Sequence, residues 1–386
     1  MSKLPEADFG SSRPAEESRV PAPKGRFQEL NPLERPGWDE LILSHREASF
    51  FHTAGWASVL QDTYGHTPHY FGVLEGERLS ALLPLMEVNS LWTGRRGVSL
   101  PFTDECPCLS DGSIAGREIF QEAIGLGRKR KWKYFEWSGI KGLSETNPPS
   151  VSFFGHVLAV SDREEEIFAR FDSRVRGPIR KAERAKVQVE ISQSFDSLLT
   201  FYSLHCKTRK KHGLPPQSLS FFRSIFRHVL SKGMGFVIVA NYQDKPIAAA
   251  VFFHFNGKAI YKFSASDSAF QHLCGNNLIL WEAIKWYSAR GYASLHFGRT
   301  SIANEGLRRF KLGFGTDEYK INFFKYDLGR ESFVPDRDRA FGWFNGVFRL
   351  MPIPLLRLIG KLLYRHLSCL GIGLDTWINL EAWVNL

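Results

Sequence analysis

The chain has 386 residues, of which 43% are apolar and 23% charged, and its formal net charge at pH 7 is +10. This composition is that of a soluble globular protein, the length predicts about two domains, and the positive charge predicts an anionic partner: nucleic acid, an anionic membrane surface or a phosphorylated substrate. No apolar run reaches about 18 residues, so a transmembrane span is not expected.

Residues 1–30 are polar and rich in proline, without an apolar run of signal-peptide length. We therefore expect a disordered lead-in and a cytoplasmic protein. The five cysteines include one close pair, Cys106 and Cys108, which has neither the spacing of a zinc site nor that of a disulfide framework. Reduced, buried thiols are the expectation.

The rest of the chain contains an internal repeat. The stretches Tyr70–Val88 and Phe236–Phe255 both predict a strand, a tight polar turn and a second strand. The stretches Ile119–Gly139 and Leu280–Gly298 both predict a helix that runs into a strand. Two similar units therefore follow in tandem.

Each unit is ordered helix, hairpin, longer excursion, helix and closing strand, a pattern that predicts an α/β (α+β) fold with mixed sheets. We expect the units at residues 31–160 and 191–328, joined by a charged helical seam at residues 161–190. Ligands favour clefts between domains, so the seam is the expected binding region.

Residues 329–386 form a polar linker followed by apolar residues mixed with Arg349, Arg357, Lys361 and Arg365. This composition is typical of basic amphipathic helices that lie on an anionic bilayer, which would place the protein at the inner face of the cytoplasmic membrane. The alternative is that the helices pack on the protein or on a second subunit. Both interpretations stay open.

Several familiar catalytic motifs are missing from the sequence. It contains no G-x-S-x-G, G-x-x-x-x-G-K-[ST], G-x-G-x-x-G or H-E-x-x-H, and its twelve histidines are scattered. A metal site and a covalent serine intermediate are therefore not expected.

Two polar clusters remain as candidates for substrate binding. Asp104 follows an apolar segment in a long loop, where a carboxylate can bind an amino group or simply face solvent in a turn. In the seam, Arg176 and Arg180 share a helix face beside Lys181, and arginine forks match phosphate oxygens. A solvated helix face is the alternative for these cations.

A third candidate is the helix start at Gly275, Asn276 and Asn277, which follows a strand that ends near Ala265. Free amide groups and the positive end of the helix dipole make such a start a site for an anion or an oxyanion.

The segment "GNNLILWEAIKWYSARGYASLHFGRTSIANEGLRRFKLGFG", Asn276 to Gly315 with the preceding glycine, resembles the C-terminal unit of the Fem-type peptidyltransferases. Residues Phe51–Val73 resemble the start of their first domain. The resemblance implies two tandem GNAT-like domains and transfer of an acyl or aminoacyl group onto an amine. It looks closest to Fem-related proteins of exopolysaccharide and exosortase systems, and classical members add amino acids from aminoacyl-tRNA to a peptidoglycan precursor.

The resemblance also implies roles for individual residues. Phe310 and Lys311 match the family's Phe-Lys pair, so Lys311 would stabilise the oxyanion. From the residues themselves, independently of the resemblance, we expect Arg176, Arg180 and Lys181 to hold the diphosphate of a nucleotide- or lipid-linked saccharide or peptide acceptor, Asp104 to orient its amine, and Arg299 to bind substrate.

The chain departs from the family at two points. It lacks the long helical hairpin of some members, and residues 271–276 lack the [QR]-x-x-G-x-[GA] pyrophosphate loop. The donor therefore stays open between acyl-CoA and aminoacyl-tRNA, tRNA stays open as a partner, and no tightly bound cofactor is expected. Two other classes also stay open: an inactive GNAT-like module that binds polysaccharide or membrane, and an RNA-binding protein.

Overall fold

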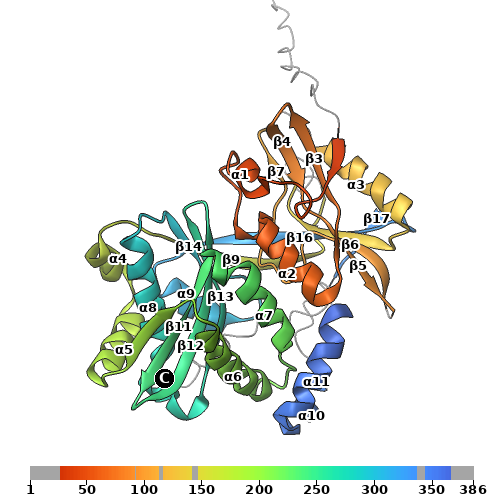
Figure 1. Ribbon diagram of the computed structural model, residues 1–386. Coiled ribbons are helices and arrows are strands. Elements are labelled where there is room, and N and C mark those ends of the chain that lie inside the picture. The colour runs from red at the N-terminus through yellow and green to blue at the C-terminus, as the bar shows by residue number, and fades with distance from the viewer. Residues whose placement is uncertain (1–26, 92, 113–115, 141–146, 337–343, 367–386) are drawn as a thin grey trace, which may run out of the picture.

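The computed structural model describes residues 27–91, 93–112, 116–140, 147–336 and 344–366. Two α/β halves lie side by side, and long strands run through both of them (Figure 1). Most of residues 1–30, the predicted lead-in, falls outside the described ranges. Residues 27–30 were wrongly included in it, because they form a strand that pairs antiparallel with residues 70–73.

Described strands form one sheet of thirteen and one of four. Along the larger sheet the order is β10 (Gln188–Ser192), β11 (Gly235–Tyr242), β12 (Lys245–Phe255), β13 (Lys258–Ser266), β14 (Ser294–His296), β9 (Val151–Ala159), β16 (Asp317–Asp327), β8 (Tyr134–Ser138), β6 (Gly94–Val98), β5 (Met86–Ser90) and β2 (Thr67–Pro68), with β15 (Thr300–Ser301) on β9 and β17 (Ser332–Phe333) on β16. The smaller sheet has the order β1 (Phe27–Leu30), β3 (Tyr70–Glu75), β4 (Arg78–Leu83) and β7 (Leu109–Ser110).

At the centre of the large sheet the two halves exchange strands. β9 comes before the second half in sequence, yet it lies between β14 and β16. β16 comes at the end of the second half, yet its residues 323–327 pair with β8 of the first. Each half is thus completed by a strand from the other, so the sheet of thirteen strands runs continuously through both tandem units.

Both predicted hairpins are present, as β3–β4 and β11–β12. In the second, Gln243 and Asp244 have φ of 49° and 58°. Two consecutive positive φ values give a turn whose twist matches that of the flanking strands. The repeat read from the sequence therefore has a structural counterpart in each half.

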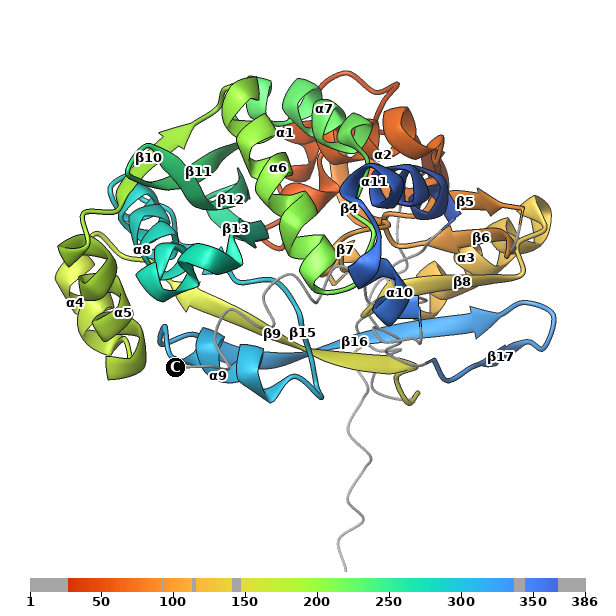
Figure 2. The same cartoon turned by 90° about the horizontal axis from the view of Figure 1, so that it is seen from below.

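Helices cover both faces of the second half (Figure 2). Along β11, Phe236 and Ile238 pack with the helices of one face, and Val237 with those of the other, as the two-residue strand period requires. The helices of the second half are α4 (Glu164–Arg170), α5 (Ser173–Arg184), α6 (Phe195–Lys211), α7 (Leu219–His228), η2 (Leu230–Lys232), η3 (Ser268–Leu273), α8 (Gly275–Ser288) and α9 (Glu305–Leu312).

One hydrophobic core extends across the two halves. Trp56 of the first half lies edge-on to Phe221 of α7, with ring centroids 6.1 Å apart. The helices of the first half are α1 (Trp38–Ile42), η1 (Phe50–His52), α2 (Ala54–Tyr64) and α3 (Gly116–Arg130). The halves are therefore held together by packed aromatic side chains as well as by the shared sheet.

Residues 161–190 do not lie between the halves as the sequence predicted. Their helices α4 and α5 pack on α8, with Ile167 and Ile179 buried in the core of the second half. The basic C-terminal segment does form helices, α10 (Phe344–Leu350), α11 (Ile353–Leu363) and η4 (Tyr364–His366), and both α10 and α11 contact α6. None of the described helices is long and apolar enough to span a bilayer.

Candidate functional site

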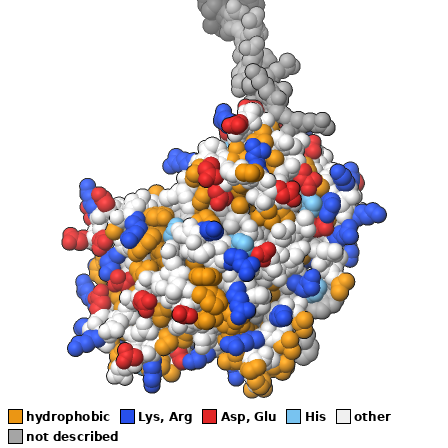
Figure 3. All heavy atoms as spheres, in the orientation of Figure 1, with side chains coloured by type: hydrophobic (Ala, Val, Ile, Leu, Met, Phe, Trp, Pro, Cys, Tyr) orange, Lys and Arg blue, Asp and Glu red, His pale blue; other side chains and the backbone are white. Residues whose placement is uncertain are grey.

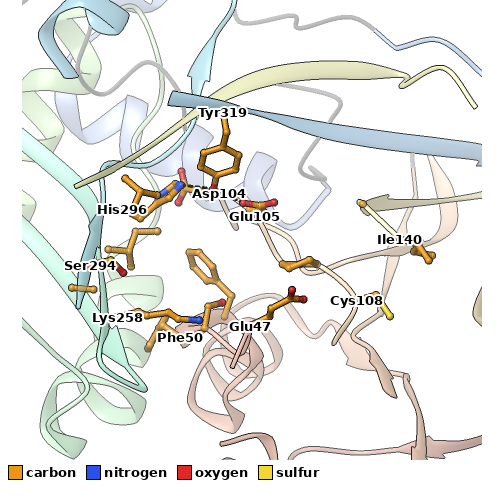
Figure 4. Close-up of a pocket in the computed structure, with 17 residues that line it drawn as sticks. Glu47, Phe50, Asp104, Glu105, Cys108, Ile140, Lys258, Ser294, His296 and Tyr319 are labelled. Carbon is orange, nitrogen blue, oxygen red and sulfur yellow. Dashed lines mark hydrogen bonds between the residues drawn. The ribbon is translucent and has the colours of Figure 1, made fainter. Parts of the chain in front are cut away.

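A cavity of about 590 Å³ lies between the two halves, and we call it the inter-half cavity. Figure 4 shows Asp104, Glu105, His296 and Tyr319 gathered at one end of it and Glu47 with Lys258 at the other. Both halves contribute lining residues: Glu47, Ser49, Phe50, Phe51, Asp104, Glu105, Pro107, Cys108, Gly139 and Ile140 from the first, and Val157, Lys258, Ala259, Ile260, Ser294, His296 and Tyr319 from β9 onward.

A tight loop after β6 carries Asp104 and Glu105 into this cavity. Leu100 and Phe102 adopt φ of 54° and 60° although both are buried apolar residues. Such left-handed backbone at a non-glycine residue is unfavourable and persists only where its surroundings fix it. Here the hydroxyl of Ser99 donates to the Cys106 carbonyl at 2.8 Å, which closes the loop.

The carboxylate of Asp104 is the centre of a buried ionic cluster. Lys262 of β13 donates to it at 2.8 Å, and the backbone N–H of Arg299 donates at 3.0 Å. Burial alone would raise the pKa of Asp104, but the charge of Lys262, with smaller contributions from His296 and Arg299, lowers it to about 2. Asp104 is therefore ionised at any physiological pH.

Lys311 of α9 lies against the same cluster. The glycine-rich stretch around Lys311 forms the helix α9. Asn304 caps the start of this helix, since its side-chain oxygen accepts a hydrogen bond from the backbone N–H of Leu307. Lys311 is 1% exposed, and its ammonium group donates to the carbonyls of Gly298 at 2.8 Å and Arg299 at 3.2 Å. Burial lowers the pKa of Lys311 to about 7, against the opposing effect of Asp104.

The turn at Gly298 and Arg299 connects these charged groups. Gly298 has φ of 73°, and a Cβ atom there would lie 3.0 Å from Oδ1 of Asp104, so any other residue would be strained at this position. The guanidinium of Arg299 is buried and lies 4.7 Å from the ring centroid of Phe153.

A hydrogen-bonded chain of three titratable side chains lines the end of the cavity. Nε2 of His296 donates to the Tyr319 hydroxyl at 3.1 Å, and that hydroxyl donates to Oε2 of Glu105 at 2.6 Å. The backbone N–H of Gly298 donates to Nδ1 of His296, which fixes the tautomer. Burial lowers the pKa of His296 to about 4 and raises that of Glu105, so the imidazole is neutral near pH 7.

A second hollow of about 640 Å³, the basic cavity, lies among α5, α9 and the start of α8. It is lined by Arg174, Val175, Gly177, Pro178, Lys181, Arg184, Cys274, Gly306, Arg309, Phe310 and Gly313. Four of these side chains are cationic and none is acidic, so the basic cavity suits a polyanion.

The first turn of α8 adjoins the basic cavity. Cys274 precedes the helix with φ of 56°, and Gly275, Asn276 and Asn277 follow as its first turn. The side chain of Asn277 is fully buried, and within the described residues neither its Oδ1 nor its Nδ2 has a hydrogen-bond partner. Free amide groups at this helix start remain suited to an anion.

The structure brings some predicted residues together and separates others. Asp104, Arg299 and Lys311 form one cluster, whereas Phe310 and Lys181 line the basic cavity. Arg176 and Arg180 line neither cavity. The Arg180 guanidinium lies over the Phe168 ring at 5.7 Å.

Sequence reasoning missed Lys262, Glu105, His296 and Tyr319. Lys262 did carry a signal, because it is a charged residue in the middle of β13, between neighbours that are almost all buried. No local pattern marked the other three, since the strand exchange alone brings β16 beside the Glu105 loop. In the described part of the chain, no group of three His, Cys, Asp or Glu residues is placed to hold a metal ion.

Part of the chain matches a known protein family. Residues 169–321 match the family described as "Acetyltransferase (GNAT) domain". This match covers most of the second half, including α5, α8, α9 and Lys311. No curated protein matches the chain in sequence.

Solved structures resemble most of the chain. The crystal structure of FemX matches with a TM-score of 0.63 at 15% identity, over 79% of this chain and 98% of that one. L-PGS from Bacillus licheniformis has a TM-score of 0.49 at 12% identity, over 86% and 98% of the two chains. A tandem GNAT protein from the clavulanic acid biosynthesis pathway has 0.45 at 11%, over 79% and 99%. At 15% identity, the FemX match shows a shared fold.

Proposed function

We propose that the protein transfers an acyl or aminoacyl group onto an amine of a cell-envelope or exopolysaccharide precursor. One observation carries the proposal: Asp104, which lines one end of the inter-half cavity, belongs to a buried cluster with Lys262 and with Lys311 of the GNAT-matching half. An amine and an activated carbonyl meeting there would find a fixed carboxylate and a desolvated cation. Direct transfer needs both groups.

The acceptor amine fits the inter-half cavity. Three carboxylates line it, those of Glu47, Asp104 and Glu105, and the rings of Phe50 and Phe51 form part of an apolar wall. Carboxylates attract an ammonium group, and apolar walls exclude water from it. Asp104 would orient the amine, because its carboxylate is negatively charged at neutral pH.

The donor fits the basic cavity. Acyl-CoA and aminoacyl-tRNA both carry phosphates, which Arg174, Lys181, Arg184 and Arg309 can neutralise beside the first turn of α8. Phe310 lines this cavity while the adjacent Lys311 reaches the Asp104 cluster. The pair would thus stand between the donor and the acceptor.

The chemistry is a direct displacement. The amine nitrogen attacks the donor carbonyl carbon, a C–N bond forms, and the C–S or C–O bond to the carrier breaks. Lys311 donates two hydrogen bonds to backbone carbonyls, which leaves its third N–H for the developing oxyanion. Glu105, with its raised pKa, accepts the amine proton, which then passes to the departing thiolate or alkoxide.

Mass spectrometry of envelope and polysaccharide precursors, from cells with and without the gene, tests this function. We expect an acyl or aminoacyl mass on a precursor amine that disappears with the gene and returns with the wild-type copy. Lys311→Met should not restore it, whereas Lys320→Met, an exposed lysine on β16, should. An unchanged precursor pattern on deletion would contradict the proposal.

A further inference from the structure

The C-terminal helices α10 and α11 present an apolar ridge to solvent. Leu350 is 85% exposed, Leu355 43%, Leu358 54% and Leu362 58%. On α11, positions 355, 358 and 362 fall on one side of the helix, since residues three and four apart are neighbours. Four exposed leucines in so short a segment mark an interaction surface rather than scattered apolar residues.

The opposite side of α11 is firmly docked, so the ridge cannot turn inward. Leu356 and Tyr364 are fully buried, and the Tyr364 hydroxyl donates to the Pro215 carbonyl at 3.1 Å. A Cβ atom on Gly360 would lie 1.9 Å from the Pro216 carbonyl oxygen, so the helix backbone touches the loop after α6. The Arg357 guanidinium lies 5.0 Å from the Tyr202 ring centroid.

A basic hollow of about 450 Å³ adjoins the ridge where α10, α11 and the end of α6 meet. Lys207, Lys210, Lys211 and Arg349 line it with Asp267, which pairs with Lys207 at 2.7 Å. Four cations against one carboxylate leave a strong positive excess. Arg349 directly precedes Leu350, so the charge and the ridge are continuous.

The space-filling view agrees with this arrangement. At its lower right, over the place of α10 and α11 in Figure 1, hydrophobic side chains gather with Lys and Arg side chains beside them (Figure 3). Lys361 of α11 and Arg365 of η4, which flank the ridge, are also exposed. An apolar stripe bordered by cations is the pattern of a helix that lies in a bilayer interface.

We propose that this surface docks on an anionic lipid bilayer, with the leucine ridge in the acyl boundary and lipid phosphates in the basic hollow. A second copy of the chain fits less well, because a symmetric contact would bring Lys210, Lys211 and Arg349 of both copies together. The net charge of +10 favours the same anionic partner. Docking would bring the protein to a membrane-attached acceptor, but it does not depend on the transferase function.

Vesicle sedimentation of the full chain tests the surface. Vesicles made from equal parts of phosphatidylcholine and phosphatidylglycerol should bind the protein at low salt, and vesicles of phosphatidylcholine alone should bind it far less. Replacing Leu355, Leu358 and Leu362 by Gln should weaken binding at least about tenfold, because the buried apolar area is lost. Lys210→Gln and Arg349→Gln should each weaken it about fivefold.

Matched controls separate this surface from general charge and hydrophobicity. Leu43→Gln, Lys232→Gln and Lys320→Gln change exposed residues elsewhere and should leave binding unchanged, with unaltered thermal melts in all variants. No binding to the phosphatidylglycerol vesicles, or equal loss in the controls, would overturn the proposal. So would a wild-type dimer in light scattering that the leucine replacements convert to a monomer, which would assign the ridge to a protein partner.

Discussion

The two halves use the same strand arrangement differently. In the first, the space beyond the parallel pair β6–β8 is occupied by residues 106 and 107, and we call this place the filled gap. Pro107 forms a β-bridge with Ser138, and the Cys106 N–H donates to the Ser138 hydroxyl at 3.1 Å. In the second, the parallel pair β13–β14 ends at Ile260 and His296, and the space beyond them receives Asp104 from the first half. The loop of the first half therefore fills the space beside its own strands and also places Asp104 beside the strands of the second half.

The chemistry of the two places differs accordingly. Next to Pro107, burial raises the pKa of the Cys108 thiol to about 12, so this thiol is inert although it also lines the inter-half cavity. In the open place, Asp104, Lys262 and Lys311 form a charged cluster within the protein. Two copies of one fold thus yield one candidate reactive site, and that site needs both copies.

Removing the carboxylate from the open place should cause the largest loss of stability. Asp104→Ala leaves Lys262 buried without its partner, and we expect a loss of about 3–5 kcal/mol in chemical denaturation. Ser138→Ala at the filled gap removes one hydrogen bond and should cost about 1 kcal/mol. Equal losses would mean that the two places do not differ as described.

The ionisation of Asp104 predicts that the folded protein loses stability at low pH. The folded pKa of Asp104, about 2, lies below the usual value of 3.8, so its ionic contribution is complete above 3.8 and is lost as the pH falls toward 2. Relative to Asp104→Asn, the wild type should therefore lose stability over that interval. A stability difference that is constant with pH would contradict this.

Lys311 and Arg309 should separate binding from chemistry. Lys311→Met should lower kcat by about 10²–10³ with little change in the donor KM, because the oxyanion loses its cation. Arg309→Ala, on the basic cavity, should raise the donor KM and spare kcat. Since the pKa of Lys311 is about 7, wild-type kcat should fall as the pH rises through that value, and Lys311→Met should lack this limb.

Tyr319 should act as a positioning residue for Glu105. Glu105→Gln should lower kcat by about 10², the usual contribution of a general base. Tyr319→Phe removes the donor that stabilises the carboxylate, so the acidic limb of the kcat profile should shift to higher pH. A loss of rate without that shift would indicate a purely structural role for Tyr319.

A substitution that disturbs the packing of the first half should lower the stability of the protein without changing kcat. A Cβ atom on Gly97 would lie 2.2 Å from the Trp132 ring, so Gly97→Ala should destabilise by about 1–3 kcal/mol through overpacking. Transfer by the remaining folded protein should keep its wild-type kcat. A fall in kcat would show that the filled gap contributes to the reaction.

Local patterns in the sequence were enough to predict the repeated hairpins, the helix start at Gly275 and the helical C-terminus. They also marked Asp104 and Lys311, the first from its loop and the second from a family motif. The strand exchange escaped prediction because pairing between β16 and β8 depends on residues far apart in sequence. Arg176 and Arg180 were assigned to a ligand face by spacing alone. Spacing shows that two residues share a helix face but not which way that face points. The direction is set by the burial of Val175 and Ile179 on α5.

The central claim is that the acceptor enters between the halves, and filling that cavity tests it most directly. Ser294 lines it from β14, so Ser294→Trp should block transfer to the acceptor while donor binding in the basic cavity persists, and Ser294→Ala should transfer normally. Single-turnover transfer, measured by mass spectrometry beside donor binding by calorimetry, separates the two effects. Wild-type transfer by Ser294→Trp would contradict the account.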